Sequence, residues 1–196
     1  MLVSGSGTNL QVLLDDPAIA PRVVVVGSDR PGIQALDRAA AAGVATFVLQ
    51  PSRDGDREAF TVALREELLS RDVDTVVLAG FMRVLGPSFF APFPGRVLNV
   101  HPALLPAFPG AHAVRDALAW GAKVTGVTVH LVDEEVDHGP IVFQEAVAIR
   151  EDDDGGSLEP RIHDAEHRLL PRAVRALLDG RLRLDGRRVR VMEPAS

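Results

Sequence analysis

The chain has 196 residues, of which 46% are hydrophobic and 24% charged, with a formal net charge of −6 and no cysteine. This composition is typical of a globular protein and excludes a disordered or collagen-like chain. The absence of cysteine excludes disulfides, zinc–thiolate sites and a cysteine nucleophile, and the acidic balance argues against a protein that coats nucleic acid or anionic membrane.

The order of the predicted elements favours an α/β fold with a Rossmann-like, mostly parallel sheet flanked by helices. Short apolar runs alternate with helical patterns through the first 120 residues, which is typical of a parallel sheet. The expected elements are, in chain order, a strand at 23–26, a helix at 31–42, a strand at 45–49, a helix at 57–70, strands at 75–78 and 97–100, and a helix at 114–120.

The pattern changes toward the C-terminal half, where two alternating segments predict antiparallel strands joined by an acidic loop. The expected elements are strands at 126–132 and 141–149, a helix at 157–178 that Pro171 kinks, and a hairpin at 181–184 and 187–191 with Asp185 and Gly186 as its turn. No linker or repeat interrupts the chain, so we expect one domain over residues 1–196.

The sequence shows no targeting or membrane segment. No apolar run approaches the ~20 residues of a membrane span. The N-terminus lacks the basic region and apolar stretch of a signal peptide. We therefore expect a cytoplasmic protein.

Residues 4–9, with the sequence Ser-Gly-Ser-Gly-Thr-Asn, follow a short apolar start and precede a helical pattern that begins at Leu10. Glycines let backbone N–H groups approach an anion, and a helix N-terminus adds positive potential. The loop therefore suits a phosphate group, although a capped turn would have the same composition. It matches neither a Walker sequence nor a full dinucleotide fingerprint.

Two further motifs carry side chains with catalytic chemistry. Asn99 and His101 alternate along the end of a predicted strand, so they face the same side, where open α/β sheets bind ligands. An amide donor beside an imidazole suits a developing oxyanion. Asp137, in the acidic loop before Gly139, could orient a histidine and raise its pKa. The alternatives are a structural histidine and a solvated loop.

These motifs resemble, in this order, the glycinamide ribonucleotide formyltransferases, which take a formyl group from a folate. The resemblance also rests on Leu-Ala-Gly-Phe-Met-Arg at 78–83 and Phe-Pro-Gly-Ala-His at 108–112, and it spans essentially the whole chain. The Asn-x-His-Pro and Asp-x-Gly motifs are shared with other folate-dependent formyltransferases and the related deformylase. The phosphate loop and residues 108–112 point to the glycinamide ribonucleotide branch.

The resemblance implies that Asn99, His101 and Asp137 are the catalytic residues. His101, held by Asp137, would stabilise the oxyanion or donate a proton, with Asn99 as a second donor, while an amine attacks 10-formyltetrahydrofolate. The residues implied to bind glycinamide ribonucleotide are Gly7, Thr8, Asn9, Pro102, His163 and Glu166. Those implied to bind folate are Arg57, Met82, Arg83, Val84, Leu85, Asn99, Val132, Asp133, Glu134, Glu135, Val136 and Asp137.

The same resemblance implies small-molecule substrates, with the folate as formyl-donor cosubstrate, and no metal, nucleic acid or membrane partner. It permits a monomer or a homodimer. Three features depart from the family. Ala103 stands where many relatives have serine, and Ala107 where relatives often have a polar or basic residue. The first strand is also short, since relatives begin several residues earlier, so either the start lies upstream or the strand is frayed.

Other functions compete with formyl transfer. Hydrolysis of the same folate would need only water in place of the amine, but known hydrolases of this kind carry an extra N-terminal domain. Formylation of methionyl-tRNA would need a further C-terminal domain with a basic face. A catalytically silent nucleotide-binding module would not need Asn99, His101 and Asp137 together. His163, Glu166 and His167 match a zinc-peptidase pattern, but a third ligand from a later helix is lacking. The roles of His112, His130 and His138 stay open.

Overall fold

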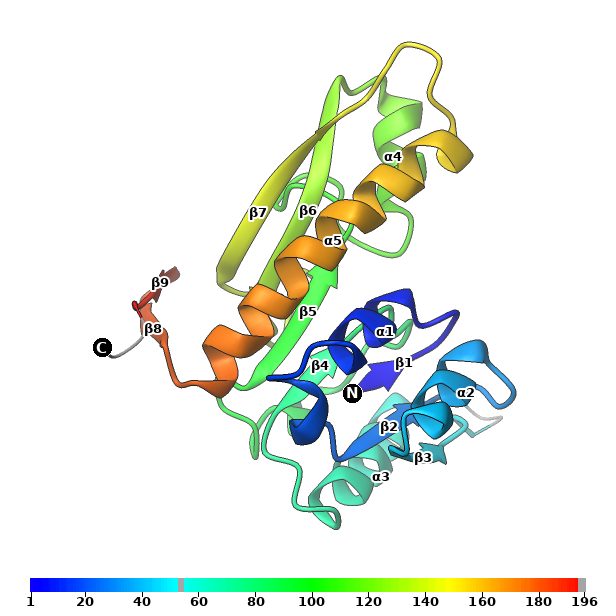
Figure 1. Cartoon of the computed structure of the whole chain (residues 1–196), viewed down its shortest axis with the longest axis vertical. Coiled ribbons are helices and arrows are strands. Elements are labelled where there is room, and N and C mark those ends of the chain that lie inside the picture. Colours follow the sequence, from blue (N-terminus) through cyan, green and yellow to red (C-terminus); the bar gives the residue numbers. More distant parts are fainter. Residues whose placement is uncertain (53–54, 194–196) are drawn as a thin grey trace. The chain divides into compact units, whose positions relative to one another are not determined.

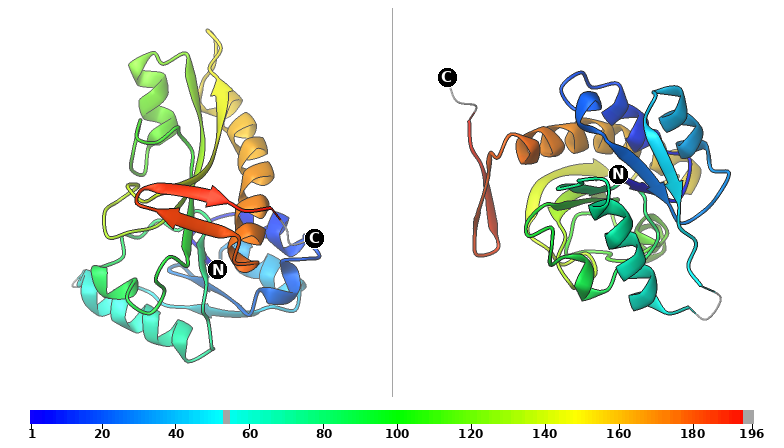
Figure 2. Two further views of the ribbon diagram at one scale, coloured as in Figure 1. Left: turned by 90° about the vertical axis from the view of Figure 1, so that its left-hand side faces the viewer. Right: turned by 90° about the horizontal axis from the view of Figure 1, so that it is seen from below.

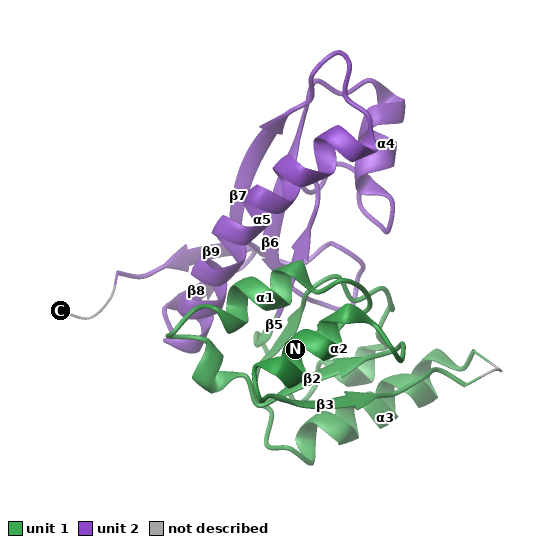
Figure 3. Cartoon of the chain, turned by 45° about the vertical axis from the view of Figure 1, so that its right-hand side comes forward, with its two compact units in different colours: residues 1–97 green, residues 98–196 purple. Residues whose placement is uncertain are grey.

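The computed structural model describes residues 1–52 and 55–193, and the chain divides into two compact units, residues 1–97 and 98–196 (Figure 3). Within the described residues, the first unit contains four parallel strands and the second unit three antiparallel strands. This confirms the α/β fold and its change to antiparallel strands in the C-terminal half. The single domain expected over residues 1–196 stays a prediction.

The first unit is a parallel sheet with strand order β3-β2-β1-β4. Its strands are β1 (Leu2–Val3), β2 (Val25–Ser28), β3 (Ala45–Val48) and β4 (Val76–Leu78). Its helices are α1 (Thr8–Leu14), α2 (Gln34–Ala41) and α3 (Arg57–Leu69), with the short 3-10 turns η1 (Ala20–Arg22) and η2 (Pro87–Phe89) (Figure 1).

Strand β1 is short, as expected, but it is not frayed. It pairs in parallel with β2 on one side and β4 on the other, and both of its residues are fully buried. Two residues suffice here because neighbouring strands satisfy the backbone on both sides. The paired strand thus fixes the point at which the glycine-rich loop begins.

Two boundaries in the first unit differ from the prediction. The valine run enters the sheet only at Val25, because Val24 lies outside the strand after η1 and is 55% exposed. The helix expected from residue 31 begins instead at Gln34, because Gly32 has a φ of +66° and turns the chain first.

In the second unit, helix α5 packs on the antiparallel strands β6 and β7 (Figure 1). The strands of its part of the sheet are β5 (Val97–His101), β6 (Val124–Leu131) and β7 (Ile141–Ala148), and its helices are α4 (Ala113–Trp120) and α5 (Gly155–Leu178). Asp154 begins α5 with a reciprocal capping box to Ser157. The buried stripe of α5 agrees with the predicted helical spacing, and the helix continues through Pro171.

The hairpin β8 (Leu182–Asp185) and β9 (Arg188–Val191) follows the C-terminal end of α5 (Figure 2). Asp185 pairs with Arg188, so the turn consists of Gly186 and Arg187, one residue later than predicted. Gly186 has a φ of +56°, which a turn of this kind requires. Across the described residues, we find no helix with the length and apolar character needed to cross a membrane.

Candidate active site

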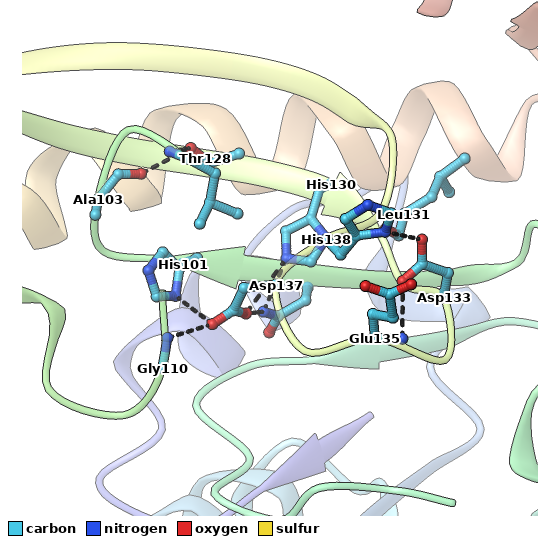
Figure 4. A network of polar contacts seen from close by, with 12 residues as sticks. His101, Ala103, Gly110, Thr128, His130, Leu131, Asp133, Glu135, Asp137 and His138 are labelled. Atoms are coloured by element: carbon cyan, nitrogen blue, oxygen red, sulfur yellow. Dashed lines mark hydrogen bonds and ion pairs between the residues drawn. The ribbon is translucent and has the colours of Figure 1, made fainter. Parts of the chain in front are cut away.

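The predicted catalytic residues of the second unit meet in one hydrogen-bonded cluster (Figure 4). Asn99 and His101 lie on β5, and the antiparallel register places His130 of β6 opposite Asn99. Asp137 comes from the loop between β6 and β7. Side chains separated by 38 positions in sequence are thus brought together by strand pairing and one loop.

His101 is held through both of its ring nitrogens and is only 4% exposed. Its Nε2 lies 2.8 Å from the Phe108 carbonyl oxygen, and its Nδ1 lies 3.4 Å from Oδ2 of Asp137. A carbonyl oxygen can only accept, so Nε2 carries a hydrogen. The second nitrogen faces the Asp137 carboxylate, so both neighbours of the ring are hydrogen-bond acceptors.

Asp137 is fixed by several contacts, and its side chain is 10% exposed. Its Oδ2 accepts a 2.7 Å hydrogen bond from the Gly110 backbone N–H, and its Oδ1 lies 3.5 Å from Nδ2 of Asn99. Its φ of +53° lies in the left-handed region, which non-glycine residues seldom occupy and which often marks functional sites. The strained backbone turns this carboxylate toward His101.

Two residues after Asp137, the backbone of Gly139 passes very close to strand β6. A Cβ atom at Gly139 would lie 1.8 Å from the Leu131 carbonyl oxygen, so only glycine fits there. The Asp-x-Gly spacing therefore has a local physical cause. The glycine lets the chain re-enter the sheet immediately after the carboxylate has been presented.

His130 belongs to the cluster, although the sequence did not reveal its role. It is fully buried, and burial lowers the pKa of its imidazole against the opposing effect of its hydrogen bond to Leu131. Its Nδ1 lies 2.9 Å from the Leu131 carbonyl oxygen and donates to it, so Nε2 accepts from Nδ2 of Asn99 at 3.1 Å. A neutral histidine thus orients the Asn99 amide.

The segment after His101 is anchored by Thr128 on β6. The Thr128 hydroxyl donates to the Ala103 carbonyl at 2.7 Å, and it accepts from the Leu105 N–H at 3.0 Å and from Nε2 of Gln144 at 2.9 Å. Gln144 also donates to the Leu105 carbonyl. The Ala103 side chain is fully buried. The position at which many relatives have serine is therefore not accessible to solvent in this structure.

A family model described as formyl transferase matches residues 1–174. The chain belongs to the formyl transferase family. It is 49% identical over 179 residues to phosphoribosylglycinamide formyltransferase of Mycobacterium tuberculosis, covering 90% of this chain and 83% of that protein. A solved structure of glycinamide ribonucleotide transformylase 1 from Symbiobacterium toebii has a TM-score of 0.89 and 46% identity, covering 98% of this chain and 92% of the other. The resemblance inferred from the motifs is confirmed.

Other formyl transferase relatives differ from this chain in length. The chain is 45% identical over 190 residues to the trifunctional purine biosynthetic protein adenosine-3 of Chironomus tentans, but it covers only 14% of that protein. A formyltetrahydrofolate deformylase structure from Pseudomonas syringae matches with a TM-score of 0.88 and 25% identity, and 64% of its chain is covered. The same fold therefore serves proteins named for transfer and for hydrolysis.

In the first unit of this formyl transferase family member, the glycine-rich loop is closely packed. Gly7 has a φ of +74° directly before α1, and a Cβ there would lie 2.6 Å from that of Ala35. Thr8 is half-buried and Asn9 is buried in the first turn of α1. Ser4 donates to Asp29 at 2.6 Å, which ties the start of the loop to β2.

The segment 82–85, predicted to bind folate, also lies in the first unit. Met82 is 57% and Val84 50% exposed, whereas Leu85 is buried. Arg83 donates through Nε to the fully buried carboxylate of Asp29 at 2.8 Å, so its guanidinium anchors the segment. Arg57, at the start of α3, is exposed.

The remaining predicted binding residues lie in the second unit. Val132 and Asp133 are half-buried, and the tip of the acidic loop, residues 134–136, is exposed. Pro102 is half-buried after β5. On α5, Glu166 is 5% exposed, whereas His163 is exposed and stacks on His167 with ring centroids 6.3 Å apart. In the described part of the chain, no three metal-ligating side chains gather into a group.

Three histidines left open by the sequence have distinct surroundings. His130 supports Asn99, as described above. His112 is exposed at the start of α4, and its side chain makes no capping hydrogen bond. His138 is exposed as well, but it contacts both Asp133 and Arg187. No sequence pattern distinguishes these roles, because each depends on a partner far along the chain or across a loop.

Proposed function

We propose that this chain transfers the formyl group of 10-formyltetrahydrofolate to the amine of 5-phosphoribosylglycinamide. The observation that carries the proposal is the cluster of Asn99, His101 and Asp137, in which an imidazole and an amide are both held by a buried carboxylate. The 49% identity to a phosphoribosylglycinamide formyltransferase supports this choice of substrates.

The proposed reaction begins when the amine nitrogen bonds to the formyl carbon. The formyl oxygen becomes an oxyanion, which the His101 ring and the Asn99 amide stabilise once each gives up one of its present hydrogen-bond partners. The bond from the formyl carbon to the folate nitrogen then breaks, and that nitrogen gains a proton as the attacking amine loses one. Asp137 keeps the His101 ring in position throughout the reaction.

The binding roles follow the family pattern and belong to the same proposal. Gly7, Thr8 and Asn9 bind the substrate phosphate through backbone N–H groups at the start of α1. Arg57 pairs with the acidic tail of the folate. The exposed segment Met82–Val84 and the 132–137 loop contact the folate, while Pro102, His163 and Glu166 contact the ribonucleotide. The protein is cytoplasmic and a monomer or homodimer in this proposal, and it requires no metal.

Hydrolysis of 10-formyltetrahydrofolate is the second candidate, favoured by the structural likeness to a deformylase. The two reactions share the same oxyanion and differ only in whether an amine or water attacks. The lower identity to that protein, 25% against 49%, favours transfer.

The test follows release of the deformylated folate by its absorbance, with and without 5-phosphoribosylglycinamide. Turnover that requires the ribonucleotide is the expected result. Turnover without it would establish the hydrolase, and no turnover in either case would leave a silent binding module. Treatment with a chelator is expected to leave the rate unchanged, and a loss restored by Zn²⁺ would implicate His163 and His167.

A further inference from the structure

The turn of the C-terminal hairpin reaches the loop that carries Asp137. Arg187, in the turn between β8 and β9, donates through Nη2 to the His138 carbonyl oxygen. Its Nη1 lies 3.1 Å from Nε2 and 3.4 Å from Nδ1 of the same histidine. Both the backbone and the ring of His138 are therefore held by one guanidinium.

The other side of His138 faces its own loop. Its Nδ1 lies 3.0 Å from Oδ2 of Asp133, whose Oδ1 accepts from the Glu135 backbone N–H at 3.1 Å (Figure 4). Nδ1 donates to the carboxylate, which leaves Nε2 with a lone pair for Arg187. With the hydrogen on Nδ1, the ring thus satisfies both charged partners, Asp133 from the loop and Arg187 from the hairpin.

Movement of His138 is coupled to Asp137 by the backbone. The two residues share a peptide bond, and Asp137 already occupies the left-handed region with a φ of +53°. On the other side, Gly139 is pressed against the Leu131 carbonyl and has no room to shift toward β6. A contact that fixes the His138 carbonyl therefore limits the directions in which the Asp137 carboxylate can turn.

We propose that Arg187 is a positioning residue, which holds the Asp137 loop in its active geometry by bridging the hairpin to His138. The inference rests on the proposed function, because it assigns Asp137 to the chemistry. Other hairpin arginines with described contacts stay local. Arg183 donates to the Gly180 and Leu182 carbonyls, and Arg190 pairs with Asp185.

The experiment compares Arg187→Ala with Arg183→Ala, a matched change on the same hairpin. We expect kcat to fall about 3- to 10-fold in Arg187→Ala, the scale of one solvent-exposed hydrogen-bonded contact, and to stay unchanged in Arg183→Ala. Arg187→Lys, which can still donate to the His138 carbonyl, should recover part of the loss. An unchanged kcat in Arg187→Ala, or an equal fall in the control, would overturn the proposal.

A second measurement does not depend on turnover. Amide hydrogen exchange of residues 133–138 in the free protein should be faster in Arg187→Ala than in Arg183→Ala, and equal exchange would overturn the bridge itself. Asp137→Ala is assayed in parallel. If that variant keeps full activity, the proposed function fails; if it is inactive while Arg187→Ala is normal, only the positioning role fails.

Discussion

Replacement of Asp137 by asparagine removes one charge while keeping the size of the side chain. The carboxylate lies 3.4 Å from Nδ1 of His101 and accepts the Gly110 N–H at 2.7 Å. An asparagine can keep the bond to Gly110 through its carbonyl oxygen, but its NH₂ group then faces Asn99 and His130. Asp137→Asn therefore tests the charge and the orientation of His101 with little change in packing.

The magnitude follows from the separation of the two charges. A protonated His101 ring would attract the carboxylate by about 5 kcal/mol at 3.4 Å and an effective dielectric constant of about 20. Both side chains are nearly buried, so solvent screens this pair little. If the charged His101 stabilises the oxyanion, its loss corresponds to a fall in kcat of about 10³- to 10⁴-fold. Because the substitution removes one partner of a nearly buried pair, the free energy of unfolding should also fall by about 3–5 kcal/mol.

The assay is the steady-state rate of formyl transfer, followed by the absorbance of the folate product at saturating concentrations of both substrates. Asp116→Asn is the control, because the side chain of this α4 residue is 44% exposed and pairs with its neighbour Arg115. Thermal unfolding of both variants checks that they are folded. A folded Asp137→Asn enzyme with kcat within tenfold of wild type would refute the assigned role of this charge.

Three further predictions concern the support of the site. Thr128→Val removes the hydroxyl that accepts from Leu105 and Gln144, so the free energy of unfolding should fall by about 2–4 kcal/mol in denaturant titrations. Burial lowers the pKa of His130, so below the ordinary value of 6.5 the unfolded chain binds a proton that the folded chain does not. Wild-type stability should therefore fall as pH drops below about 6.5 and stay level above it, and His130→Gln should lack this component. Gly139→Ala places a Cβ 1.8 Å from a carbonyl oxygen, so the loop must move and kcat should fall at least about tenfold.

Matched variants control these three predictions. Thr125, a buried threonine on the same strand as Thr128, has a hydroxyl without a hydrogen-bond partner in the described structure, so Thr125→Val should cost nothing or stabilise. Equal losses for Thr125→Val and Thr128→Val would contradict the proposed network. Gly155→Ala, where the nearest contact of a Cβ is 3.8 Å, should keep full activity beside Gly139→Ala. For His130, parallel pH dependences of the wild type and His130→Gln would contradict the lowered pKa.

The identities of most elements followed from local patterns, whereas their edges did not. The valine run at 23–26 correctly predicted a strand, but only tertiary packing decided that Val24 stays exposed and that pairing continues to Ser28. Likewise, glycine allowed a turn at either of two positions in the last hairpin, and the pairing of Asp185 with Arg188 selected one. Pairing is a long-range interaction, so a local pattern cannot specify its first or last residue.

The sequence by itself determined the α/β class, the family, and the three residues that we propose for catalysis. It could do so because the periodicity of strands and helices can be read from neighbouring residues. The Asn-x-His-Pro and Asp-x-Gly motifs are likewise only three or four residues long, so they can be recognised without the fold. Only the tertiary structure decided that His130 orients Asn99 and that Arg187 holds His138. Those partners are set by strand register and by the position of the hairpin turn, which bring together residues 31 and 49 positions apart.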